Sequence, residues 1–127
     1  MINVGFVGAG RISDLHARAY RDNPKARIAA VADPDEHNRT TRGDAWDVDP
    51  ARRYADAADL FADDSIDMVE MLVPHHLHLP LTVAAMEAGK AVSLQKPMAL
   101  TLAEADTLIA AADRTQVAFK IFENFVF

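Results

Sequence analysis

Two glycines near the start of the chain, Gly8 and Gly10, are the first residues whose spacing points to chemistry. They follow an apolar run of strand length at residues 2–7, and a helical pattern of apolar residues begins directly after them. Gly8 permits a sharp turn, and Gly10 has no Cβ to keep the backbone away from a bound anion. A pyrophosphate could then lie over the free N–H groups at the start of the helix. The pattern predicts a dinucleotide-binding loop that contains Gly8, Gly10, Arg11 and Ile12.

Ser13 stands where the dinucleotide-binding pattern usually has its third glycine. That position governs the packing of the helix on the strand, so a small serine weakens the match without breaking it. A glycine pattern alone is a weak signal. Here it follows a strand, opens a helix and has an acidic residue, Asp33, in the expected place downstream.

Asp33 follows a second predicted strand at residues 26–32. A carboxylate at this strand end accepts hydrogen bonds from the adenosine ribose of NAD and repels the 2′-phosphate of NADP. Two unit charges ~4 Å apart interact by roughly 4 kcal/mol at an effective dielectric constant of about 20, so we expect NAD to be preferred. Arg39 or Arg42 could still reach a 2′-phosphate, and NADP stays possible. The alternative role is a helix cap, which we prefer for Asp35.

Polar residues also follow three later strands, predicted at residues 68–73, 91–94 and 117–122. Ligands of a doubly wound sheet collect beyond the carboxyl ends of its strands. We therefore expect these residues on the same edge as the glycine loop, at the nicotinamide end of a bound cofactor. The first segment holds Pro74 with His75, His76 and His78, the second holds Gln95 and Lys96, and the third holds Glu123 and Asn124.

The elements that must position these residues alternate between strand and helix. This order predicts right-handed crossovers and a doubly wound parallel sheet with both faces covered, a Rossmann-type dinucleotide-binding domain over residues 1–127. We expect the helix at 35–46 to break near Gly43, and the helix at 77–88 to stop at Gly89. Thr101 and Glu104 form a capping box for a helix through Ala112. The remaining predicted elements are helices at 12–20 and 56–62 and a short strand at 53–54.

Composition limits the classes of function. The chain has 127 residues, half of them hydrophobic and a quarter charged, as in a globular domain, and no cysteine for disulfides or thiolate chemistry. Residues 33–67 hold eleven acidic and four basic side chains, which argues against nucleic acid or an anionic membrane as partner. No apolar run approaches the ~20 residues of a membrane span, and no signal-type segment stands at the start, so we expect a cytoplasmic protein.

Together these motifs resemble the Gfo/Idh/MocA family, named for glucose–fructose oxidoreductase, inositol dehydrogenase and rhizopine catabolism. The resemblance covers all 127 residues, and its most specific motif is Gln95-Lys96-Pro97-Met98-Ala99. The other motifs are Gly8-Ala9-Gly10-Arg11-Ile12 with His16, Ala32-Asp33-Pro34-Asp35, Pro74-His75-His76-Leu77-His78 and Glu87-Ala88-Gly89-Lys90.

The resemblance implies an NAD(P)-dependent oxidoreductase that transfers hydride to or from a sugar, cyclitol or related hydroxy compound. It makes Lys96 the catalytic residue, which reaches the nicotinamide ribose and the substrate hydroxyl and stabilises developing oxyanion charge. Family members usually carry Glu where this chain has Gln95, so Lys96 lacks that ion partner. Pro97 resembles a family proline that follows a cis peptide bond and directs Lys96 into the cleft.

The resemblance also assigns the other polar residues. It places His75 or His76 near the nicotinamide ribose and Asn124 near the substrate edge, although Asn124 could equally be structural. It makes His16 a structural residue that joins the first helix to the cofactor loop. His78 either bonds the backbone or contacts the ligand. A metal site at His75 and His78 is disfavoured, because no carboxylate or cysteine stands beside them.

Four of the six phenylalanines fall in the last nine residues, whereas chain ends are normally polar. We therefore expect a fragment that lacks a C-terminal substrate domain. The resemblance implies that this domain supplies the catalytic histidine and most of the substrate pocket, and that the full-length protein is a homo-oligomer. The fragment alone would bind cofactor without turnover.

Other classes fit less well. A non-catalytic module that senses NAD(H) could use the same loop and Asp33, but it would not need Lys96. A methyltransferase usually has an acidic residue before its glycine loop, where this chain has Phe6 and Val7. Short-chain dehydrogenases need a Tyr-x-x-x-Lys pair, and neither tyrosine of the chain has a lysine at that spacing.

Overall fold

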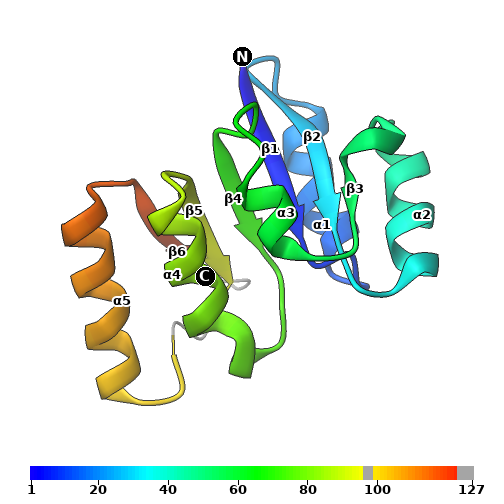
Figure 1. Cartoon of the computed structure of the whole chain (residues 1–127). Coiled ribbons are helices and arrows are strands. Elements are labelled where there is room, and N and C mark those ends of the chain that lie inside the picture. The colour runs from blue at the N-terminus through cyan, green and yellow to red at the C-terminus, as the bar shows by residue number, and fades with distance from the viewer. Residues whose placement is uncertain (96–98, 123–127) are drawn as a thin grey trace, which may run out of the picture.

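The computed structural model describes residues 1–95 and 99–122. Within them, six parallel strands form one sheet in the order β3-β2-β1-β4-β5-β6 (Figure 1). The chain proceeds from β1 outward to β3 and then crosses to β4 on the other side of β1. This reversal is the switch point of a doubly wound sheet, which confirms the predicted Rossmann-type fold. The strands are β1 (Ile2–Val7), β2 (Ala26–Ala32), β3 (Arg53–Tyr54), β4 (Met68–Met71), β5 (Ala91–Gln95) and β6 (Phe119–Phe122).

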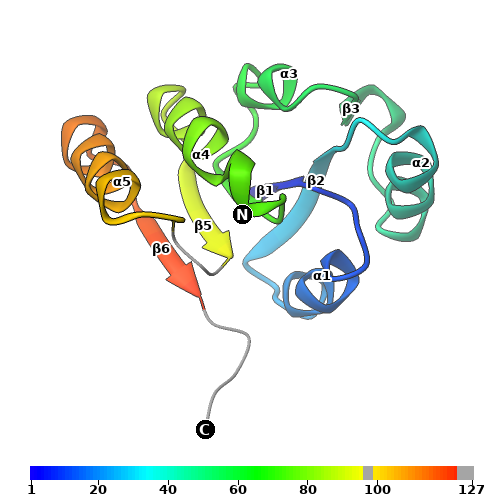
Figure 2. The same cartoon turned by 90° about the horizontal axis from the view of Figure 1, so that it is seen from below.

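Helices connect the strands and pack on both sides of the sheet (Figure 2). The helices α1 and α2 lie on one side, here called the α1 face, where Phe6 packs edge-on against Trp46 with ring centroids 4.9 Å apart. On the opposite face α3, α4 and α5 bury Leu60, Met86 and Leu108. The α-helices are α1 (Ser13–Arg21), α2 (Glu36–Ala45), α3 (Ala57–Phe61), α4 (His78–Glu87) and α5 (Leu102–Thr115), and the 3₁₀ helices are η1 (Pro50–Arg52) and η2 (His75–Leu77).

The prediction that both faces of the sheet are covered is wrong for part of the α1 face. There, no helix of residues 1–95 and 99–122 lies over β5 and β6 (Figure 2). Strand register places Glu70, Ser93 and Lys120 in one row across β4, β5 and β6, and these polar residues line a hollow on this face. Glu70 is only 2% exposed because Tyr20 from α1 covers it and donates its hydroxyl to the carboxylate. Burial and the neighbouring Glu70 both raise the pKa of Tyr20.

Helix α2 does not break at Gly43 as expected, but continues to Ala45. A Cβ at Gly43 would lie only 2.6 Å from Cδ of Arg53, so the missing side chain leaves room for that arginine. The Arg53 guanidinium donates to the carbonyl of Val48 at 2.7 Å and pairs with Asp44 at 2.7 Å. Gly43 therefore serves tertiary packing rather than chain breaking.

Other helix signals in the sequence hold. Gly89 has a φ of 82° and follows the end of α4 as predicted. Thr101 caps α5 by accepting the backbone N–H of Glu104 at 3.1 Å, which is one half of the predicted capping box. The Glu104 carboxylate accepts the N–H of Leu100 at 3.0 Å, one residue before the position that a capping box uses. Helix α5 nevertheless runs beyond Ala112 to Thr115, and Gln116 ends it in the left-handed conformation with a φ of 60°.

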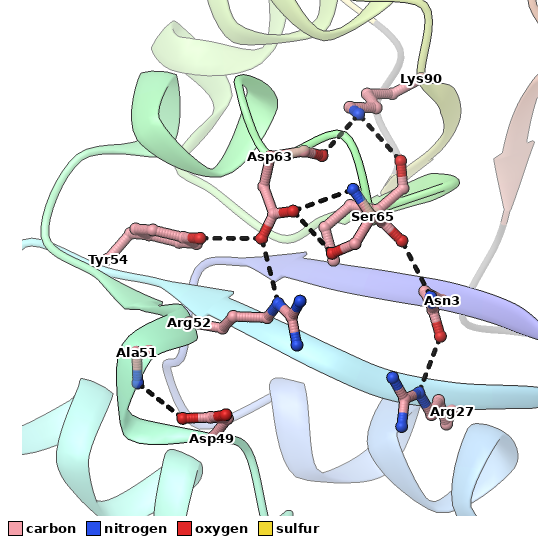
Figure 3. Close-up of polar contacts among 10 residues, drawn as sticks. Asn3, Arg27, Asp49, Ala51, Arg52, Tyr54, Asp63, Ser65 and Lys90 are labelled. Atoms are coloured by element: carbon pink, nitrogen blue, oxygen red, sulfur yellow. Dashed lines mark hydrogen bonds and ion pairs between the residues drawn. The ribbon is translucent and has the colours of Figure 1, made fainter.

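A polar network joins the segments at the amino edge of the sheet (Figure 3). The carboxylate of Asp63 accepts hydrogen bonds from the hydroxyls of Tyr54 at 2.8 Å and Ser65 at 2.6 Å, and pairs with Arg52 at 3.3 Å. Lys90 is 5% exposed and donates to two backbone carbonyls, one of them that of Asp63. Burial alone would raise the pKa of Asp63, but the hydrogen bonds from Ser65 and Tyr54 and the charge of Arg52 outweigh it and lower the pKa from 3.8 to about 2.

This depressed pKa makes stability depend on acid pH. Between the folded pKa of about 2 and the ordinary value of 3.8, the unfolded chain binds more protons at Asp63 than the folded chain does. The stabilisation is complete above this window and is lost as the pH falls through it. As the pH is lowered from 3.8 to about 2, we therefore expect the unfolding free energy to fall more steeply in the wild type than in Asp63→Asn. Urea titration at a series of pH values measures this. A parallel fall in the two proteins would contradict the role of Asp63.

Candidate functional site

A cleft of about 920 Å³ opens at the carboxyl ends of the strands, beside the switch point between β1 and β4. The segments that follow β1, β2, β3 and β4 contribute to its lining, together with Gln95 at the end of β5. The expected convergence on the glycine-loop edge is thus confirmed for two of the three later strands, through Pro74 and His75 after β4 and Gln95 at the end of β5. The third segment, with Glu123 and Asn124, lies outside the described residues. The predicted site residues that line this cleft are Gly8, Gly10, Asp33, Pro74, His75 and Gln95.

Gly8 and Gly10 are glycine for different reasons. Gly8 has a φ of 101°, and a Cβ there would overlap the backbone carbonyl of Leu72, which follows β4. Its N–H donates to the carbonyl of Ala32 at 2.8 Å, so the turn is held between β2 and β4. A Cβ at Gly10 would meet no atom within 4 Å. Gly8 is therefore required by the fold, whereas Gly10 leaves open space at the start of α1.

Asp33 ties the end of β2 to the glycine loop. One carboxylate oxygen accepts the N–H of Ala9 at 2.8 Å, and the other accepts the N–H of Asp35 at 2.8 Å. Each oxygen has a second lone pair that remains available for a ribose hydroxyl. Asp35 caps α2 by accepting the N–H of Asn38 at 3.0 Å, as preferred from the sequence. Asp33 thus shapes the loop and also presents its carboxylate to the cleft.

Several predicted site residues lie away from the cleft lining. Arg11 and His76 are exposed, and Ile12 packs against the apolar cluster on the α1 face. Lys96 and Asn124 lie outside the described residues, so their roles stay predictions.

Two histidines are tied to the protein. His78 is 1% exposed, and its Nε2 lies 3.0 Å from the carbonyl of Val73, which favours the backbone-bonding alternative. Nδ1 of His16 lies 3.5 Å from a carboxylate oxygen of Glu70, so this contact joins α1 to β4, whereas we expected a link to the cofactor loop. Within the described ranges, no three His, Cys, Asp or Glu side chains gather into a metal-binding group.

With this geometry in place, comparison with known proteins identifies the chain's family. The sequence profile of the Gfo/Idh/MocA family, described as "Oxidoreductase family, NAD-binding Rossmann fold", matches residues 2–122. The chain belongs to this family. The resemblance that was based on the motifs is thereby confirmed.

Named relatives of this Gfo/Idh/MocA chain include two curated dehydrogenases. D-apiose dehydrogenase from Paraburkholderia graminis is 36% identical over 119 residues, which cover 94% of this chain and 31% of that protein. Inositol 2-dehydrogenase 1 from Saccharopolyspora erythraea is 35% identical over 111 residues, covering 86% of this chain and 32% of that protein. The chain thus spans about a third of the length of these relatives.

A solved structure extends the likeness to three dimensions. An oxidoreductase from Agrobacterium radiobacter, in complex with NAD⁺, L-tartaric acid and magnesium, superposes on this chain with a TM-score of 0.92 at 29% identity. The match covers 98% of this chain and 36% of that chain. Among the described residues of this Gfo/Idh/MocA domain, no helix combines the length and apolar character needed to cross a membrane.

Sequence reasoning missed the apolar walls of the cleft. Leu72, Val73, Leu77 and Leu81 line it beside the predicted Pro74. Residues 55–57 also line it, and they follow Tyr54, whose carbonyl accepts the N–H of Asp33 at 3.0 Å. The candidate residues predicted after β4 were Pro74 and histidines, and no aliphatic side chain was among them. The segment at 55–57 follows a predicted strand in the same way as Asp33 does, so its position along the chain was a usable signal.

The contrast between the two glycines is testable by substitution. We expect Gly8→Ala to lower the unfolding free energy by about 3 kcal/mol or more, because it adds backbone strain and an overlap with Leu72. Gly10→Ala should stay within about 1 kcal/mol of the wild type. Urea titration of both variants measures this difference, and equal losses of stability would contradict the assignment.

Proposed function

We propose that this chain is the cofactor-binding domain of an oxidoreductase that transfers hydride between NAD and a hydroxyl-bearing carbon of a sugar, cyclitol or related compound. The observation that carries the proposal is the pairing of open space at Gly10 with a carboxylate held at the end of β2. The names of the curated relatives, an apiose dehydrogenase and an inositol dehydrogenase, support the substrate class.

The lining of the cleft fits an extended dinucleotide. The space at Gly10, over the first N–H groups of α1, would take the pyrophosphate. Asp33 would accept the adenosine ribose hydroxyls, and residues 55–57 would border the adenine end. Pro74, His75 and Gln95 lie on the side of β4 and β5 and would face the nicotinamide end.

Bound NAD supplies the nicotinamide C4 that exchanges hydride with the substrate carbon. The chain's task is to orient that carbon and to manage the accompanying proton and charge. We assign this task to Lys96, which directly follows the cleft residue Gln95 in the sequence. Its ammonium would orient the substrate hydroxyl and stabilise developing negative charge on the oxygen.

The remaining parts of the proposal concern the longer protein. Because relatives extend well beyond the matched region, we propose that a substrate domain outside this chain completes the pocket and that the full-length protein is a cytoplasmic homo-oligomer. A non-catalytic NAD(H)-sensing module is not favoured, because relatives that match the chain are named dehydrogenases.

Calorimetric titration of the chain with NADH and with NADPH tests cofactor binding. Saturable binding that is tighter for NADH supports the proposal, and failure to bind either dinucleotide contradicts it. We expect Asp33→Asn to lower the ratio of the Kd for NADPH to the Kd for NADH by about tenfold, because the amide carries no charge to repel a 2′-phosphate. The amide oxygen can still accept the N–H of Ala9. Asp35→Asn is the matched control, since Asp35 caps α2 and does not line the cleft. An unchanged preference in Asp33→Asn would show that Asp33 does not select the cofactor.

Lys96 is tested in a protein that carries this chain together with its substrate domain. We expect Lys96→Ala to reduce turnover about 100-fold or more while the Kd for NADH changes little, because the lost interaction belongs to the transition state. Lys25→Ala, which removes an exposed lysine, is the control. Equal losses in turnover and cofactor affinity would make Lys96 a binding residue only.

A further inference from the structure

We propose that Arg42 is a positioning residue of the cofactor site, which holds the glycine loop in place and cancels the charge of Asp14 beside the pyrophosphate. The inference rests on the proposed function, because it concerns how the same loop receives a dinucleotide. Arg42 lies on α2, outside the lining of the cleft, so it would act through the loop rather than touch the cofactor.

The contacts of Arg42 converge on the loop and the first turn of α1. Its Nη1 lies 3.1 Å from a carboxylate oxygen of Asp14. Its Nε donates to the hydroxyl of Ser13 at 3.3 Å, and its Nη2 reaches the carbonyl of Gly10 at 3.5 Å. All three guanidinium nitrogens are engaged in this way. Arg42 is therefore committed to the loop, and a role in binding the 2′-phosphate of NADP is not favoured.

Ser13 is the link between the arginine and the loop. Its side chain is fully buried, donates its hydroxyl to the carbonyl of Gly10 at 2.5 Å and accepts from Arg42. A glycine at this position, as in the usual dinucleotide-binding pattern, would have no group to make either bond. The serine therefore gives this loop a connection to α2 that the usual pattern lacks.

Asp14 gives the arginine an electrostatic role. It lies in the first turn of α1, whose N-terminal N–H groups and dipole form the expected pyrophosphate site. An uncompensated carboxylate there would repel the pyrophosphate. Arg42 neutralises it, and the indole N–H of Trp46 also donates to it at 3.2 Å. Both partners come from the end of α2, so they hold the Asp14 carboxylate against that helix.

The test is a double-mutant cycle on the chain, with calorimetry for NADH and ligand-observed NMR for adenosine, which carries no phosphate. We expect Arg42→Met to raise the Kd for NADH about tenfold at low salt and less at high salt, because salt screens the freed Asp14 charge. The Kd for adenosine should not change. Combining Arg42→Met with Asp14→Asn should restore most of the NADH affinity, and Asp14→Asn alone should bind NADH at least as tightly as the wild type.

The control is Arg21→Met, which removes the same charge from an exposed site at the far end of α1 and should leave both Kd values unchanged. Equal weakening of NADH and adenosine in Arg42→Met, or no recovery in the double variant, would overturn the proposal. So would weaker NADH binding in Asp14→Asn, which can be measured even where Arg42→Met unfolds. If the wild type binds NADH and Arg42→Met binds it equally well, only this inference fails. If the wild type binds no dinucleotide, the proposed function fails with it.

Discussion

The site depends on the close approach of the glycine loop to β4. The backbone at Gly8 turns so near the carbonyl of Leu72 that no side chain fits between them. Once there, the loop is held from the other side, since Gly8 donates to Ala32 and Ala9 donates to Asp33. The loop thus lies at the switch point, hydrogen-bonded to the end of β2 and in close backbone contact with the segment after β4. The open space at Gly10 follows from this anchoring.

Two polar assemblies support opposite edges of the same sheet. At the amino edge, the network around Asp63 and Lys90 connects the segments that enter β4 and β5 with the end of β3 (Figure 3). At the carboxyl edge, Arg42 and Asp33 connect α2 and β2 with the glycine loop. Burying these groups is tolerable because the buried ones form hydrogen bonds or ion pairs. The two assemblies thus connect segments whose strands have a different order in the sheet than in the sequence.

The two faces of the sheet are built differently. The face under α3, α4 and α5 is closed by apolar side chains, as expected for a parallel sheet. On the α1 face, the row of Glu70, Ser93 and Lys120 brings polar groups to β4, β5 and β6, where strands buried on both faces would carry apolar side chains. Tyr20 and His16 of α1 reach across to Glu70 and shield its carboxylate. The helix that follows the glycine loop is therefore also the cover of a buried acid.

Sequence alone determined the features that depend on neighbouring residues. The strand–helix alternation, the helix cap at Thr101, the helix stop at Gly89 and the glycine loop with its downstream Asp33 are all local signals. Only the tertiary structure decided that Gly43 makes room for Arg53, that His16 lies beside Glu70 and that Arg42 holds the loop at Gly10. These contacts join residues far apart in the chain, and no local pattern specifies which distant side chain fills a space or neutralises a charge. The partner is set by how the helices pack on the sheet, which requires the whole fold.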